Sequence, residues 1–257
     1  MSDDELVREQ HDHVVVLRLN RPEVRNALNP SLIRSFGAAV TDADSDPTVR
    51  ALVVTGTGDR AFSSGMDLRA FAEGGGLAMD TPEMQAFMRF MDGALSLPVV
   101  GAAQATAVAG GLELLLGCDM VVAAEGARFG LPEVQRGLIP GGGGTLLGTR
   151  IPLALAMELV LTGDSVDAGR ALQMGLVNAV VARDDVLPTA LAMAERIAAN
   201  GPLAVRAAKE LTRLAAFAPS AVAARLEHWR PVVFGSEDAR EGAVAFVEKR
   251  KPTWRGR

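Results

Sequence analysis

The residues best suited to do chemistry are a glutamate and two glycines that precede it. Gly110 and Gly111 stand at the predicted start of a helix, and Glu113 falls in its first turn. The first N–H groups of a helix have no partner within it, and the helix dipole favours negative charge there. Such N–H groups can form an oxyanion hole. Because Glu113 stands among leucines, it is either a carboxylate that stabilises its own helix or a buried acid–base group.

A second glutamate stands in a similar setting. Glu133 follows Pro132, and a proline followed by a glutamate is also a common way to open a helix. Four consecutive glycines follow at 141–144. Glycine loses more conformational freedom on folding than other residues, so we expect this run where backbone packs closely or lines a site. The run is not a phosphate loop, because the Lys-Ser/Thr ending is absent.

The sequence offers few residues for other kinds of catalysis. The histidines are His11, His13 and His228, and none lies near the glycine-rich centre, where a Ser-His-Asp hydrolase would need one. No further His or Cys could complete a metal site with the first two. The single cysteine, Cys118, lies in an apolar run and is predicted to be a buried, inert thiol. Acid–base work therefore falls to carboxylates.

Composition describes a globular chain with a mild negative charge. The 257 residues are 49% hydrophobic and 22% charged, with a formal net charge of -5. No basic stripe with interleaved aromatic residues is present, so we expect no nucleic-acid partner. The first ten residues, MSDDELVREQ, are acidic and polar, unlike a secretory or transit peptide, and no apolar run has the length of a membrane span. We expect a cytoplasmic protein with no membrane partner.

The elements that must position the glutamates alternate between strands and helices. Apolar and β-branched runs predict strands at Val14–Leu19, 49–55, Val99–Ala103 and 120–123. Helical spacing predicts helices at 32–43, 82–97 and 112–117. This alternation predicts an α/β domain. The turn Gly56-x-Gly58-x-x-Ala61 does not open into a helical pattern, so a dinucleotide site is not expected there. Beyond about residue 167 the chain is Ala-rich and predicted to be largely helical.

Four segments, in this order and spacing, resemble the enoyl-CoA hydratase/isomerase (crotonase) family: SSGMDL, AVAGGLELLLGCD, FGLPEVQRGLIPGGGGT and EGAVAFVEKRKPTW. The resemblance extends from LNRPEVRNAL to the last ten residues. It implies an α/β fold with a crotonase-like spiral of repeated β-β-α units over residues 1–195. It also implies a C-terminal helical oligomerisation subdomain over 196–257, which would pack homotrimers, often paired into hexamers.

The resemblance further implies roles for particular residues. The backbone N–H groups of Ser64 and Gly110 would hold a thioester oxygen, and Glu113 and Glu133 would act on water. Lys249 matches a lysine close to the CoA phosphates that commonly reaches a neighbouring subunit's site. The residues implied in CoA binding are Arg25, Ala27, Ser64, Asp67, Leu68 and Lys249. No metal and no separate cofactor are implied, because coenzyme A is part of the acyl-CoA substrate.

The chain departs from the family pattern in three places. The usual Asn-Gly ahead of the glycine turn is Gln104-Ala105, and the first of three glycines is Ala109. The usual Thr-Gln-Arg-Leu after the glycine run is Thr-Leu-Leu-Gly at 145–148. That last segment lies near the acyl pocket in the family, so the departure bears on the choice of acyl chain.

Two glutamates favour an enoyl-CoA hydratase, a lyase that adds water reversibly and syn to a trans-2-enoyl-CoA thioester. One carboxylate can take a proton from water while a protonated one delivers a proton to the α-carbon. Three alternatives remain open. The first is another reaction of the family: double-bond isomerisation, thioester hydrolysis or dehydration of a specialised hydroxyacyl-CoA. The others are a non-catalytic acyl-CoA binding protein and a purely structural scaffold.

Overall fold

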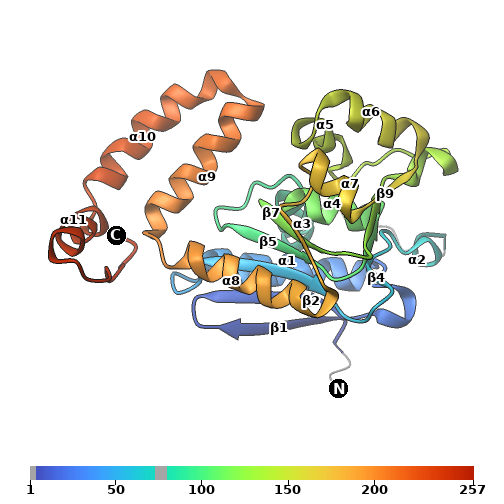
Figure 1. The fold of residues 1–257 in the computed structure, drawn as a ribbon, viewed down its shortest axis with the longest axis horizontal. Coiled ribbons are helices and arrows are strands. Elements are labelled where there is room, and N and C mark those ends of the chain that lie inside the picture. Colours follow the sequence, from blue (N-terminus) through green and yellow to red (C-terminus); the bar gives the residue numbers. More distant parts are fainter. Residues whose placement is uncertain (1–3, 73–79) are drawn as a thin grey trace.

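The computed structural model describes residues 4–72 and 80–257, and two β-sheets form the centre of this part of the chain (Figure 1). The larger sheet has the order β1-β2-β3-β5-β7-β10 and is parallel except for the β1–β2 hairpin. The smaller sheet has the order β4-β6-β8-β9. The strands of the larger sheet are β1 Leu6–His11, β2 Val14–Leu19, β3 Ala51–Gly56, β5 Val99–Ala103, β7 Met120–Ala124 and β10 Ala179–Val181. Those of the smaller sheet are β4 Ala61–Ser63, β6 Thr106–Val108, β8 Arg128–Gly130 and β9 Ser165–Asp167.

Consecutive strands bend from the larger sheet into the smaller one. Strand β3 continues into β4, β5 into β6 and β7 into β8, and a helix follows each second strand. This repeat is the β-β-α spiral that the sequence implies, so the predicted fold class is confirmed. The turn after Gly56 leads into β4 and not into a helix, as its sequence indicated. The short strands of the smaller sheet were not predicted, because three residues are too few for an alternating pattern to show.

Helices cover the sheets on the outside of the spiral. Helices α1 and α3 pack against each other, with the Phe36 ring edge-on to those of Phe87 and Phe90. The α-helices are α1 Pro30–Ser45, α2 Leu68–Ala72, α3 Pro82–Met91, α4 Gly110–Gly117, α5 Leu147–Arg150, α6 Leu153–Thr162, α7 Ala168–Met174, α8 Val186–Ala198, α9 Pro202–Phe217, α10 Val222–Phe234 and α11 Glu237–Glu248. The 3-10 helices are η1 Pro22–Val24, η2 Pro132–Arg136, η3 Gly144–Leu146, η4 Arg183–Asp185 and η5 Pro219–Ala221. No helix within 4–72 and 80–257 is both long and apolar enough to cross a membrane.

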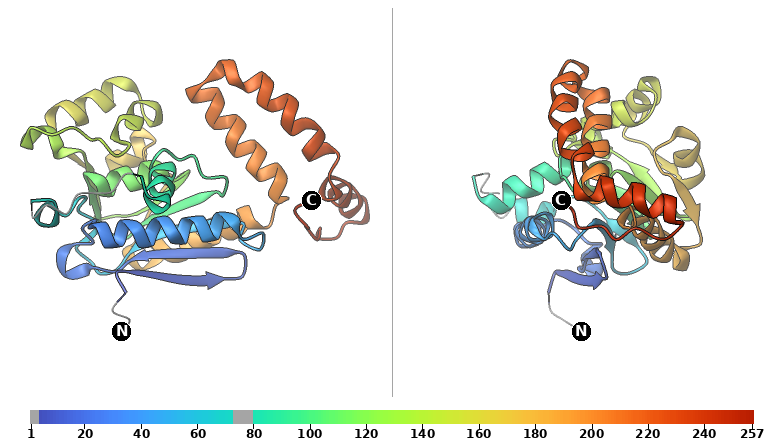
Figure 2. Two further views of the ribbon diagram at one scale, coloured as in Figure 1. Left: turned by 180° about the vertical axis from the view of Figure 1, so that it is seen from behind. Right: turned by 90° about the vertical axis from the view of Figure 1, so that its left-hand side faces the viewer.

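Helices α9, α10 and α11 form an arm that projects from the sheets (Figures 1 and 2). The helix before it, α8, packs against β3, β5 and β7 through Ala190, Ala194 and Ala198, which are buried at helical spacing. The sequence-based boundary between residues 195 and 196 falls in the last turn of α8. On the arm, Phe234 and Phe246 are 79% and 85% exposed. Exposed aromatic surface of this kind is characteristic of interaction sites.

The buried cysteine gives a first prediction. Cys118 caps the C-terminal end of α4 and is fully buried. Burial, reinforced by the neighbouring charge of Asp119, raises the pKa of its thiol to about 12. We expect no modification by iodoacetamide at pH 8 in the folded protein and one adduct after unfolding, measured by intact mass. Labelling of the folded protein at the rate of a free thiol would show that the end of α4 opens.

Candidate active site

Glu113 is the centre of the site, and helix α4 buries it almost completely. The side chain is 5% exposed and lies in the first turn of a helix whose leucines are all buried. Its Oε1 atom accepts the N–H groups of Gly142 at 2.7 Å and Gly144 at 2.9 Å. Glu113 therefore does more than stabilise its own helix: its carboxylate is held by a second segment of the chain. This resolves the alternative that the sequence left open, in favour of a buried group with partners.

The four-glycine run is the segment that holds this carboxylate. A Cβ on Gly142 would lie 2.8 Å from Glu113 Oε2, and one on Gly144 would lie 2.3 Å from the Pro140 side chain. Gly143 has φ of 115°, a conformation that L side chains rarely adopt. The sequence predicted that this run lies where backbone packs closely or lines a site, and two of its glycines do pack closely, donating directly to Glu113.

Glu133 lies in η2, where Pro132 opens the helix as the sequence indicated. Its Oε2 atom is buried and has no hydrogen-bond partner among the described residues. An oxygen enclosed in this way is costly to ionise, so it favours a protonated carboxyl group or a bound polar ligand. The negative charge of Glu113 acts on Glu133, so the two predicted glutamates lie within electrostatic range of each other.

Both carboxyl groups have pKa values above their ordinary range. Burial raises the pKa of Glu113, and the N–H groups of Gly144 and Gly142 oppose this by stabilising the ionised form. Burial also raises the pKa of Glu133; a hydrogen bond from its own backbone N–H opposes this, and the charge of Glu113 raises the pKa further. The two carboxyl groups differ in their hydrogen bonds. Glu113 Oε1 accepts two backbone N–H groups, whereas Glu133 Oε2 accepts none within the described residues. The arrangement favours an ionised Glu113 beside a protonated Glu133.

The backbone at Gly65 and Gly110 forms a second part of the site. A Cβ on Gly65 would lie 2.7 Å from the Gly110 nitrogen, and one on Gly110 would lie 3.5 Å from the Met66 nitrogen. Within the described residues we find no protein acceptor for the N–H of Met66 or of Gly110. The two donors lie at one place and are free to hold an oxyanion.

One sequence-based assignment needs correction here. Ser64 was expected to supply an oxyanion donor, but its N–H donates to the Arg25 carbonyl at 3.0 Å. Its neighbour Gly65 donates to the Ser63 hydroxyl at 3.2 Å. Met66, two positions along, carries the free N–H, while Gly65 and Asp67 on either side make the β-bridge with Leu28. The motif SSGMDL was correct as a region, but which N–H is free depends on the loop that pairs with it.

Ala109, which replaces the first glycine of the family pattern, is strained. It is the residue before α4 and has φ of 51° and ψ of −133°. This region is used almost only by glycine, and a non-glycine residue held there costs about 1–3 kcal/mol. Its N–H donates to the Gly130 carbonyl, and its own carbonyl accepts the N–H groups of Leu112 and Glu113. The strain is thus stored at the start of the helix that carries Glu113.

Ala109→Gly is expected to stabilise the protein. The free energy gained by relieving the backbone strain exceeds the entropic cost of a more flexible unfolded chain. We therefore expect the free energy of unfolding to rise by about 1 kcal/mol and Tm by about 2–4 °C. Thermal unfolding followed by circular dichroism measures this. Ala107→Gly, at a buried position in β6, is the control and should lower Tm. If Ala109→Gly lowers Tm as the control does, Ala109 is not strained.

The residues implied in CoA binding fall into two groups. Arg25, Ala27, Asp67 and Leu68 lie together, because the loop before α1 pairs with the segment 64–67. Leu68 begins α2 and is 50% exposed. Lys249, by contrast, ends α11 on the projecting arm, on the opposite side of the molecule from α2 (Figures 1 and 2). A single chain therefore does not bring Lys249 to the other predicted residues.

Arg21 organises the first of these groups, and sequence reasoning did not single it out. Its guanidinium donates to the Ala27 carbonyl at 2.6 Å and pairs with Asp67 at 3.1 Å and Glu5 at 2.9 Å. The carboxylate of Asp67 is thereby engaged within the protein, and it also accepts the Ala70 N–H in α2. The segment LNRPEVRNAL contained the signal, since an arginine within it needs an anionic partner when partly buried.

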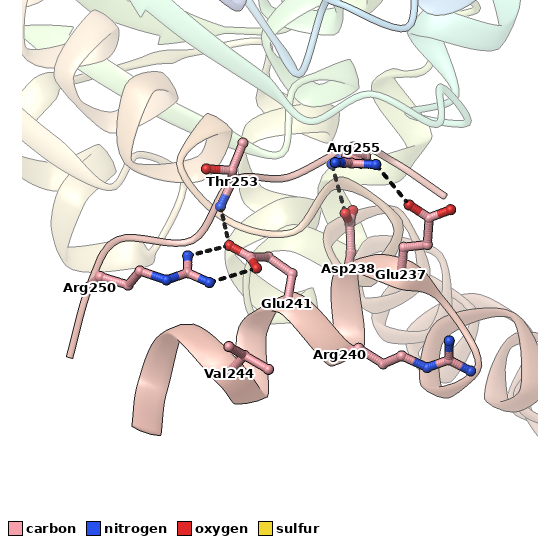
Figure 3. A pocket seen from close by; sticks show the side chains of 8 residues that line it. All are labelled: Glu237, Asp238, Arg240, Glu241, Val244, Arg250, Thr253 and Arg255. Atoms are coloured by element: carbon pink, nitrogen blue, oxygen red, sulfur yellow. Dashed lines mark hydrogen bonds and ion pairs between the residues drawn. The ribbon is translucent and has the colours of Figure 1, made fainter. Parts of the chain in front are cut away.

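A groove lies between α11 and the C-terminal tail, away from the glutamate pair (Figure 3). Its carboxylates have partners within the protein. The Arg250 guanidinium donates to both oxygens of Glu241, at 2.6 and 2.9 Å, and the backbone N–H of Arg255 donates to the Asp238 carboxylate at 2.7 Å. These contacts fasten the tail to α11. The groove contains none of the residues that the sequence predicted for a site.

The chain is similar to known proteins over nearly its whole length. The sequence profile described as enoyl-CoA hydratase/isomerase matches residues 9–257. The chain is 37% identical over 253 residues to carnitinyl-CoA dehydratase of Salmonella enteritidis PT4, covering 95% of both chains. An enoyl-CoA hydratase of Mycobacterium tuberculosis H37Rv superposes with a TM-score of 0.90 at 41% identity, covering 98% of this chain and 99% of the other. A carnitinyl-CoA hydratase of Mycobacterium avium superposes with a TM-score of 0.79 at 39% identity over 100% of both chains.

The chain belongs to the enoyl-CoA hydratase/isomerase family, as its sequence motifs indicated.

Proposed function

We propose that this protein is a lyase that adds water to 2-enoyl-CoA thioesters and catalyses the reverse dehydration. One observation carries the proposal: Glu113 is buried and held by the N–H groups of Gly142 and Gly144, and its charge acts on Glu133, a partly buried glutamate whose Oε2 atom is enclosed. Relatives that cover nearly the whole chain bear the names enoyl-CoA hydratase and carnitinyl-CoA dehydratase. Both names describe the gain or loss of water.

The reaction would place negative charge on the thioester oxygen as an enolate forms. The free N–H groups of Met66 and Gly110 are suited to hold this oxygen, and one such donor supplies about 3 kcal/mol in comparable enzymes. They act without reorganisation, because Gly65 and the start of α4 already fix them. Helix α4 adds the positive end of its dipole at the same place.

The two glutamates would divide the proton transfers of a syn addition. Ionised Glu113 accepts a proton from the attacking water, and protonated Glu133 delivers a proton to the α-carbon. Their surroundings support this division, since Glu113 accepts two backbone N–H groups and Glu133 Oε2 accepts none within the described residues. Isomerisation of a double bond needs only one base and would leave the second carboxyl group without a role.

Binding of the substrate would use both groups of implied residues. The loop at Arg25 and Ala27, with Asp67 and Leu68 beside it, would receive the CoA moiety. We propose that Lys249 reaches the CoA phosphates of a neighbouring copy, because in its own chain it lies on the arm away from them. This requires an oligomer, which we propose to be a homotrimer or a dimer of trimers; we also propose that the protein is cytoplasmic. The reaction itself calls for no cofactor other than the coenzyme A of the substrate.

The second candidate substrate is a carnitinyl-CoA thioester, and the dehydratase relative at 37% identity supports it. The test is a panel of short, long, branched and aromatic 2-enoyl-CoA thioesters with carnitinyl-CoA, and products identified by mass. Gain of 18 Da with an uncharged enoyl-CoA supports the hydratase, and its loss from carnitinyl-CoA alone supports the second candidate. Tight binding of the thioesters with no change in mass or in the position of the double bond would contradict both and support a binding protein.

A further inference from the structure

The C-terminal end of α4 needs hydrogen-bond donors that water cannot easily supply. The last carbonyls of a helix have no partner within it. Here the helix is buried along its length, from Gly111 to Gly117, and Cys118 follows at full burial. Carbonyl groups in such a place require donors from elsewhere in the protein.

Arg150, at the end of α5, supplies these donors. Its Nη2 donates to the carbonyls of Leu116, at 2.9 Å, and Cys118, and its Nη1 donates to that of Asp119 at 3.2 Å. A single planar guanidinium thus satisfies three carbonyls at the end of α4 and just beyond it. Its positive charge also lies at the negative end of the α4 dipole, which is a favourable position.

The segment that ends at Arg150 begins at the carboxylate of Glu113. Gly142 and Gly144 donate to Glu113 Oε1 near the N-terminal end of α4, and the chain then passes through η3 and α5 to Arg150 at the C-terminal end. The segment 142–150 therefore contacts α4 at both ends. The placement of the two donors on Glu113 depends on how this segment is fastened to the helix.

We propose that Arg150 is a positioning residue, which fixes the segment 142–150 on α4 and so holds the Gly142 and Gly144 N–H groups on Glu113. The inference deepens the proposed hydratase function and rests on it for the role of Glu113. It accounts for a partly buried arginine in a part of the chain that contains no residue predicted to bind the substrate. It also assigns a task to α5, whose sequence departs from the family pattern just before Arg150.

Few charged groups lie near Glu113 and α4. Glu133 in η2 is the titratable group coupled to Glu113, with Arg136 beside it acting on Glu133. The elements packed most extensively against α4 are α3, β4, β6 and η3, and none supplies a charge that shifts the pKa of Glu113. At the other end of α4, Lys209 pairs with the Asp119 carboxylate at 2.8 Å and donates to the Leu97 carbonyl. Lys209 is therefore buried beside Arg150 without touching the α4 carbonyls that Arg150 holds.

The test compares Arg150→Met with Lys209→Met in the full-length, assembled enzyme. In Arg150→Met we expect kcat for hydration to fall by about 10- to 100-fold, with KM changed less than about threefold, because a small misplacement of a catalytic group has effects of this size. The two N–H donors lower the pKa of Glu113, so their loss should raise that pKa. The acidic limb of the plot of kcat against pH should then move to higher pH. Guanidinium ion should restore part of kcat to Arg150→Ala, and Arg150→Lys should retain an intermediate kcat.

Lys209→Met is the matched control, since it removes a buried cation from the same cluster. It should lower Tm but leave kcat and the acidic limb where they are in the wild type. The proposal is overturned if folded Arg150→Met keeps the wild-type kcat and acidic limb, or if Lys209→Met changes both to the same extent. Should Arg150→Met fail to fold, Arg150→Lys takes its place, and an unchanged profile there overturns the proposal equally.

A second measurement separates this inference from the proposed function. The titration of Glu113 can be followed without substrate, as the infrared carboxylate band lost in Glu113→Gln. A higher Glu113 pKa in Arg150→Met supports the positioning role even if the wild type hydrates none of the thioesters in the panel. An unchanged Glu113 pKa overturns it even if the wild type is an active hydratase.

Discussion

Glu133→Gln is expected to lower kcat for hydration by about 10²–10⁴-fold, because general acid–base catalysis by one positioned group contributes that much. KM should change little, since glutamine keeps the shape of the side chain and loses only the proton to be transferred. Glu113→Gln should cause a loss of similar size, because its amide cannot take a proton from water. Steady-state kinetics with the best thioester of the panel measure both.

Glu158→Gln is the control for these substitutions. Glu158 is an exposed glutamate on α6, and this variant should keep the wild-type kcat. Wild-type kcat in either Glu113→Gln or Glu133→Gln would remove that residue from the mechanism. If both keep it, the glutamate pair is not the catalytic pair.

Glu133→Gln, which is expected to lower kcat, should raise the stability of the protein at neutral pH. Burial first, and the charge of Glu113 in addition, raise the pKa of Glu133 above its ordinary value of 4.5. A group whose pKa is raised by folding contributes its full stability below the ordinary value and loses it as pH rises through the folded value. Glu133→Gln cannot ionise, so we expect its Tm to exceed that of the wild type at pH 7–8. The difference should vanish near pH 4, and an equal difference at both pH values would show that ionisation is not its cause.

Gly65→Ala is expected to lower kcat by about 10²–10³-fold, the loss found when one oxyanion donor is removed. The added Cβ would lie 2.7 Å from the Gly110 nitrogen, so one of the two donors must move. Gly65 also has φ of 85°, which an alanine adopts only with strain, so Tm should fall as well.

The control for this prediction is Gly126→Ala, where a Cβ would meet nothing within 4 Å. This variant should keep the wild-type kcat. Because Gly65→Ala is also destabilising, its kinetics are measured well below its Tm, with circular dichroism to show that it is folded. A folded Gly65→Ala enzyme with wild-type kcat would mean that Met66 and Gly110 do not hold the thioester oxygen.

The chemical groups of the site could be read from local sequence. Three local features implied a site: Glu113 among leucines, Gly110 at a helix start and the glycine run at 141–144. Burying a carboxylate and fixing the backbone of glycines both cost free energy in any fold, so these residues stand out in the sequence itself. The β-branched runs of β2 and β5 likewise predicted those strands to the residue. The family order of the motifs then implied the spiral.

The tertiary structure alone decided which groups act together. Whether Ser64 or Met66 has a free N–H depends on Arg25 and Leu28, which are distant in sequence. The donors to Glu113 come from Gly142 and Gly144, about thirty residues away, and the cap of its helix comes from Arg150. Sequence determines which hydrogen-bonding groups exist and which side chains are too costly to bury alone. Only the folded chain determines which donors remain unpaired and where a buried carboxyl group finds its partners.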